Sequence, residues 1–226
     1  MNIEYIKDYK YKELKQYIFA YLLIVIASVG LYAKNTVDVL GILPTLFSMI
    51  AIDTLAGAIC AIVFIINELW SDKFKRRIVY KKKLPSDTIF SDIASEKIDA
   101  SGFNLARAKK IFKKFAHASP DKQTAEWNKL LQKYKDANRG NVIEAERMQL
   151  MTRDICMSTI SLLIMTSIAF LVLSFAYGSI CTALKLLGIP LIYLIIMFFV
   201  TRRAAQSRAR RAVVLVIKNA VQDSTR

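Results

Sequence analysis

Residues Leu40–Leu69 read LGILPTLFSMIAIDTLAGAICAIVFIINEL and largely decide the fold class. A helix of about 20 apolar residues crosses the hydrocarbon core of a bilayer, so this stretch is long enough to span it with some tilt. One acid, Asp53, lies well inside it. A carboxylate there costs roughly 2.5–3.5 kcal/mol on insertion scales, so it is expected to face a partner, a cavity or another subunit. Two interpretations of Asp53 stay open: a helix–helix contact and an ion path.

Three further apolar stretches, Tyr17–Ala33, Ile155–Tyr177 and Ala183–Val200, complete a set of four. Short turns join the first to the second and the third to the fourth. The sequence therefore predicts an all-α integral membrane protein with four transmembrane helices in two hairpins. The predicted domains are residues 1–70 (an N-terminal amphipathic helix and the first hairpin), 71–154 (a helical cytoplasmic insert), 155–200 (the second hairpin) and 201–226 (a basic helical tail).

The composition combines 54% hydrophobic residues with a formal net charge of +15 and a mean hydropathy of +0.33. This combination is typical of a multipass membrane protein with basic flanks rather than of a soluble domain. Lys and Arg gather before the first apolar stretch, after the second and after the fourth, whereas the two opposite turns contain only Lys34. By the positive-inside rule, both termini and the insert are expected in the cytoplasm.

Residues that start and stop helices divide the insert. Asn104 is expected to cap a helix, and Ser119 followed by Pro120 marks the start of the next. From Asn141 no helix breaker appears before Gly178, which predicts one long helix from the cytosol through the bilayer. The insert is too small to bury a core alone and is expected to pack on itself and on other subunits.

An enzymatic site is not predicted. The chain has one histidine (His117), no glycine-rich phosphate loop and no cluster of His, Cys, Asp and Glu at metal-ligand spacing. We therefore expect a non-enzyme with no catalytic residue, cofactor or metal.

A second charge, Lys185, lies in the fourth apolar stretch. Counted from the cytoplasmic ends near Glu68 and Val200, Asp53 and Lys185 are each 15 residues in, so they are expected at a similar depth. They could pair within or between subunits, which would reduce the cost of burial. Alternatively, Lys185 extends to the outer headgroups.

Hydroxyl side chains recur on one face of the third apolar stretch. They lie within an arc of about 100° when residues are placed at 100° intervals. They are candidates either for helix–helix contacts or for lining a wetted pore. The four residues are Thr159, Thr166, Ser167 and Ser174.

Basic residues of the insert and tail are candidates for binding an anionic ligand. Those next to the membrane are explained by anionic lipid headgroups, at about 1 kcal/mol per charge. Those farther along the insert are not, and a phosphate-rich ligand is the alternative there. No recognised DNA-binding module is present, so duplex DNA reading is not expected. The candidates are Arg107, Lys109, Lys110, Lys113, Lys114, Arg208, Arg210 and Arg211.

The segment KLPSDTIF (Lys83–Phe90), Trp127 in the middle of the insert and TRDI (Thr152–Ile155) resemble bacterial four-span membrane effectors of nucleotide-signalling anti-phage defence, the Hailong-type channel effector among them. The resemblance covers roughly residues 70–160 and the two-hairpin layout. It implies a homo-oligomeric channel, with a tetramer favoured, in the bacterial inner membrane. It further implies gating by a nucleotide or oligonucleotide from a partner nucleotidyltransferase, and depolarisation of the infected cell. It assigns no site residue.

Two functions remain. The first is an oligomeric ion-channel effector gated by an anionic signal through its cytoplasmic region. The second is a non-conducting membrane adaptor or immunity-type protein that recruits a partner through the basic insert.

Overall fold

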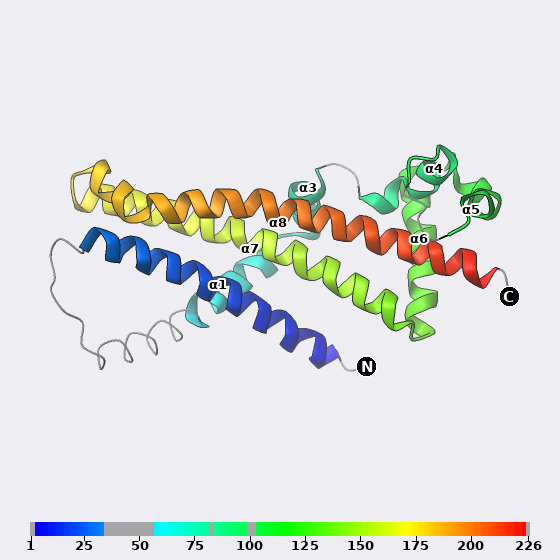
Figure 1. Ribbon diagram of the computed structural model, residues 1–226, viewed down its shortest axis with the longest axis horizontal. Coiled ribbons are helices and arrows are strands. Elements are labelled where there is room, and N and C mark those ends of the chain that lie inside the picture. The colour runs from blue at the N-terminus through cyan, green and yellow to red at the C-terminus, as the bar shows by residue number, and fades with distance from the viewer. Residues whose placement is uncertain (1–2, 34–56, 82–83, 99–102, 225–226) are drawn as a thin grey trace. The chain divides into compact units, whose positions relative to one another are not determined.

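The computed structural model describes residues 3–33, 57–81, 84–98 and 103–224, with side chains from residue 12 to residue 29 in the first of these ranges. All regular structure in these ranges is helical (Figure 1). The prediction of an all-α fold is confirmed. Asp53 and the turn after Ala33 lie outside the described residues.

Helix α1 runs from Ile3 to Ala33 without interruption. The sequence suggested a surface helix over residues 1–16 followed by a separate span. The two form one helix, because no glycine or proline occurs between Ile3 and Val29 to end the surface helix. A shorter apolar helix, Gly57–Leu69, is the described part of the second apolar stretch.

Short helices make up the polar insert. They are α3 (Asp72–Tyr80), the 3₁₀ turn η1 (Pro85–Asp87), α4 (Ile89–Ala94), α5 (Leu105–Phe112), the 3₁₀ turn η2 (Lys113–Phe115) and α6 (Pro120–Asp136). Two predicted helix starts are confirmed. The Asn104 side chain accepts a hydrogen bond from the Arg107 amide, and Pro120 occupies the first turn of α6.

Two long helices complete the chain. Helix α7 (Gly140–Ala176) has 37 residues and α8 (Ile180–Asp223) has 44. Gly178 joins them at φ +58°, a left-handed conformation that favours glycine. Both helices are long and apolar enough to cross a membrane, and they are the two described helices that meet this criterion.

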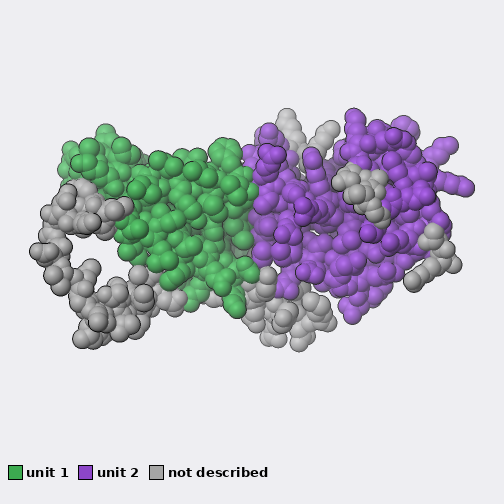
Figure 2. All heavy atoms as spheres, viewed as in Figure 1, with its two compact units in different colours: residues 1–71, 154–201 green, residues 72–153, 202–226 purple. Residues whose placement is uncertain are grey.

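The chain divides into two compact units, shown in Figure 2. Unit 1 comprises residues 1–71 and 154–201, and unit 2 comprises residues 72–153 and 202–226. The insert and the tail thus belong to one unit, and α7 and α8 each contribute residues to both units.

Unit 2 has a conventional apolar core. Phe90, Phe112 and Tyr134 lie in it, with the Phe90 and Phe112 ring centroids 4.9 Å apart. The tail helix supplies four further buried residues at helical spacing: Val213, Val216, Ile217 and Val221. The insert was expected to pack on itself and on other subunits. Its core is completed by the end of α8 in the same chain, which the sequence analysis did not predict.

Unit 1 has a smaller core in which Ile18, Val63 and Leu194 are fully buried. Its exterior is apolar. Of the large hydrophobic side chains that the described residues expose, all but Phe74 and Leu150 belong to unit 1.

Candidate functional site

The hydroxyl face of α7 divides between the interior and the exterior of unit 1. Thr159 and Thr166 are buried against α1, where their hydroxyls bond the hydroxyls of Tyr17 (2.9 Å) and Tyr21 (2.6 Å). Since each threonine also donates to a carbonyl of its own helix, each tyrosine hydroxyl is placed to donate to the threonine oxygen. These two threonines therefore act as contacts between α1 and α7.

The other two hydroxyls on that face have no partner on another helix among the described residues. Ser167 is exposed and donates to the Leu163 carbonyl, and Ser174 is partly exposed and donates to the Phe170 carbonyl. Lys185 is likewise exposed, on α8. Ser167 and Lys185 are thus accessible to a second copy of the chain, to lipid or to water.

A second polar group, which the sequence analysis did not single out, is buried in unit 1. Asn67 donates from Nδ2 to the Ser158 hydroxyl at 2.7 Å, and its Oδ1 lies 3.4 Å from the Ser161 hydroxyl. All three side chains are at most 5% exposed. The signal was present, because Asp154, Ser158 and Ser161 recur at positions i, i+4 and i+7 on one face of α7.

Two of the predicted cationic residues, Arg107 and Lys109 of α5, form contacts within unit 2. Arg107 donates to the hydroxyl and the carbonyl of Ser224, which joins α5 to the end of α8. Lys109 pairs with Glu96, and the hydrogen bond and charge of Lys109 lower the pKa of Glu96. Lys110, Lys113 and Lys114 are exposed.

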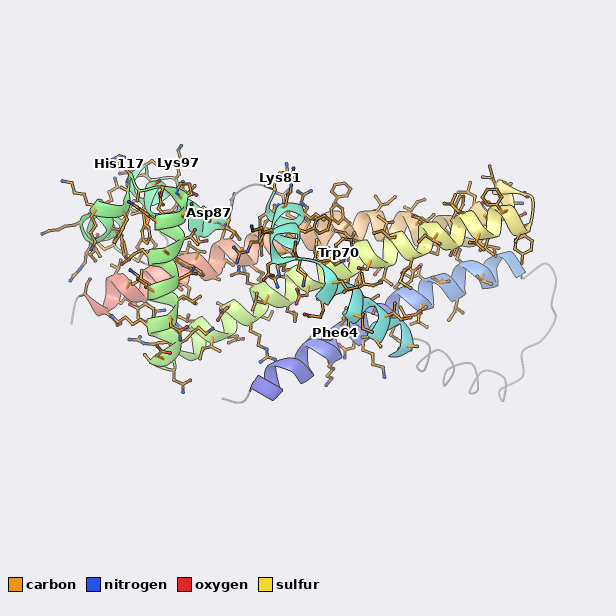
Figure 3. All side chains as sticks on the ribbon, turned by 180° about the vertical axis from the view of Figure 1, so that it is seen from behind. Phe64, Trp70, Lys81, Asp87, Lys97 and His117 are labelled. Carbon is orange, nitrogen blue, oxygen red and sulfur yellow. The ribbon has the colours of Figure 1, made fainter. Side chains whose placement is uncertain are left out.

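A different set of cations lines a groove of about 1000 Å³ in unit 2. One wall is α8, and the other is the segment from the end of α3 through η1 and α4. Among its described lining residues, five side chains are basic and one, Asp92, is acidic. Lys81 and Lys97 are labelled in Figure 3. The basic residues are Lys81, Lys97, Arg210, Arg211 and Lys218.

The structure thus brings Arg210 and Arg211 together with three lysines that the sequence analysis did not select. Lys218 had a signal, since it follows Arg211 by seven residues on the same helical face. Lys81 belongs to the basic cluster of residues 72–83, which the sequence analysis assigned to lipid headgroups. Lys97 had no signal, because it reaches the groove through the packing of α4. Arg208 is exposed and does not line the groove.

Three residues of the segment that carried the resemblance, Leu84, Asp87 and Phe90, take part in contacts that hold η1 and α4 in place. Asp87 accepts hydrogen bonds from the Leu84 amide at 2.8 Å and from the Thr124 hydroxyl of α6 at 2.7 Å. Gln123 of α6 accepts from the Phe90 amide at 3.1 Å, at the first turn of α4. These contacts fix the wall of the groove that faces α8.

No group of three or more His, Cys, Asp and Glu side chains within the described ranges is placed to hold a metal ion. Comparison of the chain with protein-family models, with curated proteins and with solved structures finds no match.

Proposed function

We propose that this protein is a four-span membrane protein that assembles into a homo-oligomeric ion channel. An anionic ligand, a nucleotide or oligonucleotide from a partner nucleotidyltransferase, binds its basic cytoplasmic unit and controls conduction. The resemblance to effectors of anti-phage defence adds the role of depolarising an infected cell.

The observation that carries the membrane part of the proposal is the distribution of polarity in unit 1. In the most apolar 18-residue windows of α7 and α8, 39% and 28% of the residues are buried, so most of these apolar side chains face outward. Hydroxyl and amide groups such as Thr159, Ser158 and Asn67 are buried instead. This arrangement is typical of a helix bundle in a lipid bilayer, where buried polar groups join helices and apolar groups face the acyl chains.

Four spans follow when α1 and the Gly57–Leu69 helix are counted with α7 and α8. Tyr17 and Tyr21 of α1 contact α7, the Ser28 hydroxyl of α1 donates to the Leu186 carbonyl of α8 at 2.8 Å, and Asn67 contacts α7. All four apolar helices therefore share one bundle. The positive-inside rule places unit 2 and both termini in the cytoplasm of a bacterial cell, with the bundle in the inner membrane.

A conducting path requires more than one copy of the chain. The hydroxyls of Thr159 and Thr166 are engaged in contacts with α1, so they are not free to line a path within one copy. Ser167 and Lys185 face outward, and on a symmetry axis these side chains would line the path together with the face that carries Asp53. A tetramer is the assembly favoured by the resemblance.

The proposal is tested by ion flux from proteoliposomes that contain the purified full chain. Lys185→Ala and Asp53→Asn are each expected to change flux or ion selectivity several-fold, because each removes a charge from the path. A change of about 1.4 kcal/mol in the free energy of an ion in the path corresponds to about 10-fold. Lys185→Arg, which keeps the charge, is the matched control and should conduct as the wild type does.

Unchanged flux in both Lys185→Ala and Asp53→Asn would remove these residues from the path. A folded, reconstituted protein that conducts no ions with or without an anionic ligand would contradict the channel and favour the non-conducting adaptor. Loss of membrane potential on expression in cells, read with a voltage-sensitive dye, separates the same two functions.

A further inference from the structure

We infer that the groove between α8 and the α3–η1–α4 segment is the binding site for a soluble organic phosphate with at least two negative charges. The groove lies within unit 2, and the residues that define it here all belong to the described ranges. This inference deepens the proposed function, on which its gating consequence rests, whereas ligand binding itself does not depend on conduction.

The charge of the groove favours an anion. Its described lining holds five basic side chains (Lys81, Lys97, Arg210, Arg211 and Lys218) and one acidic side chain. That acid, Asp92, already accepts the Thr88 hydroxyl at 2.9 Å. Among the described residues, none of the five cations forms a salt bridge. Like charges gathered in a concave, partly apolar surface focus a positive potential and attract anions.

The spread of the cations favours more than one negative group. Arg210 and Lys218 are eight residues apart on α8, which is about 12 Å along a helix. Cations spread over this length of the helix suit a ligand with more than one negative group. The guanidinium groups of Arg210 and Arg211 each offer planar donors that suit phosphate oxygens, and the three lysines add point charges to the same groove.

The apolar part of the lining favours an organic phosphate over an inorganic ion. Leu84, Pro85, Ile98, Val214 and Leu215 line the groove together with the cations. A volume of about 1000 Å³ lies at the upper end of the range for small-molecule sites, about 300–1000 Å³. A ligand with an apolar or planar portion beside its phosphates would fill it.

Position along α8 favours a soluble ligand over a lipid headgroup. Arg202 and Arg203 directly follow the apolar stretch, whereas Arg210 comes seven residues after Arg203 and Lys218 fifteen after it. Seven residues correspond to about 10 Å along a helix, and attraction to anionic lipids falls off within a Debye length of about 8 Å.

The groove adjoins a contact that links α8 to α3. Gln206 of the lining donates from Nε2 to the Val79 carbonyl at 2.7 Å, and Arg202 Nε donates to the same carbonyl at 3.3 Å. Val79 is the next-to-last residue of α3, where helix carbonyls need partners. A ligand bound to Arg210 lies one helical turn from Gln206. Ligand binding in the groove can therefore alter the hydrogen bond from Gln206 to Val79 that joins α8 to α3.

Binding is tested by isothermal titration calorimetry on the full chain in a neutral detergent, with EDTA present. The probes are ATP and pyrophosphate, and ATP is expected to bind more tightly because it also covers apolar lining. Arg210→Glu with Arg211→Glu is expected to weaken ATP binding at least about 10-fold, since charge-assisted hydrogen bonds are lost. Lys218→Gln, a milder change that should not affect folding, is expected to weaken it several-fold.

The matched control is Lys122→Glu with Lys129→Glu on α6, which changes the charge equally and lies outside the groove. It should leave ATP binding within about 2-fold at a fixed salt concentration, because it removes no direct contact. An equal loss in this control, or a loss confined to Lys110→Glu on α5 with Lys113→Glu on η2, overturns the inference.

Vesicles of phosphatidylcholine with and without phosphatidylglycerol separate the lipid source. Groove-dependent binding to the anionic vesicles without ATP or pyrophosphate binding also overturns the inference. ATP binding that depends on the groove in a protein without flux supports this inference and contradicts the proposed channel instead.

Discussion

Arg139 donates a hydrogen bond from Nη2 to the Asp223 carboxylate at 2.8 Å and so joins the turn before α7 to the last residue of α8. The two side chains are 37% and 28% exposed. We expect a double-mutant cycle with Arg139→Gln and Asp223→Asn to give a coupling of about 0.5–1 kcal/mol, because solvent screens the pair. Chemical denaturation of the full chain measures it. A coupling near zero would show that packing alone fixes the end of α8.

The amide of Gln123 holds α4 against α6. Its Oε1 accepts from the Phe90 and Ser91 amides, and its Nε2 donates to the Ser91 hydroxyl and the Ala118 carbonyl. Gln123→Ala is expected to destabilise unit 2 by about 2–4 kcal/mol, since it leaves buried backbone donors without partners.

Gln132→Ala, on the same helix but exposed, is the control for Gln123→Ala and should change stability by less than about 0.5 kcal/mol. Gln123→Met restores the volume without the hydrogen bonds. Full recovery by methionine would mean that packing, and not hydrogen bonding, explains the loss.

The contact between Tyr21 and Thr166 tests the role of the hydroxyl face. A double-mutant cycle with Tyr21→Phe and Thr166→Val in detergent should give a coupling of about 0.6 kcal/mol, the usual size of a hydrogen bond between membrane helices. Ser167→Ala, which removes an outward hydroxyl, should leave stability unchanged and alter ion flux. If Thr166→Val changed flux at unchanged stability, Thr166 would belong to the ion path.

Alkaline pH should weaken unit 2 through Tyr134. Burial, together with the negative charge of Asp223, raises the pKa of Tyr134 to about 12 from an ordinary value of 10.0. Because the folded state favours the neutral phenol, its stability is fully present below pH 10 and is lost as the pH rises through about 12, by about 2 kcal/mol across that interval.

Tyr134→Phe separates this effect from the titration of lysines, which both proteins share. The variant should show a smaller loss of stability between pH 10 and pH 12 than the wild type. Parallel stability curves for the two proteins would exclude Tyr134 as the cause.

Much of the secondary structure was predictable because local residues set it. Asn104 caps α5, Pro120 begins α6, and Gly178 ends the helix that starts near Asn141, as their conformational preferences require. Long-range packing was less accessible. Val213 and Ile217 recur at helical spacing in a segment rich in arginine, which predicts an apolar helix face. The pattern does not identify the insert as the partner that this face covers.

The candidate site was predicted in part for the same reason. The arginines of α8 stand out in the sequence, but a cation lines a groove only when a second wall lies opposite. Lys97 belongs to that wall because Asp87 and Gln123 fix η1 and α4 on α6, and these contacts join residues more than 30 positions apart. Charge alone therefore pointed to α5, where Arg107 and Lys109 are engaged in structural contacts instead.

The contribution of α8 to the core of unit 2 has a consequence for biosynthesis. Residues 72–153 leave the ribosome before the helix that covers them, and the segment from Arg153 to Ala212 must be translated first. At about 5–20 residues per second, this delay is about 3–12 s. During that interval the apolar surface around Phe90 and Phe112 lacks the side chains of α8 that cover it in the folded chain. We therefore expect this surface to be prone to aggregation during synthesis, and slow codons between residues 154 and 212 to lower the yield.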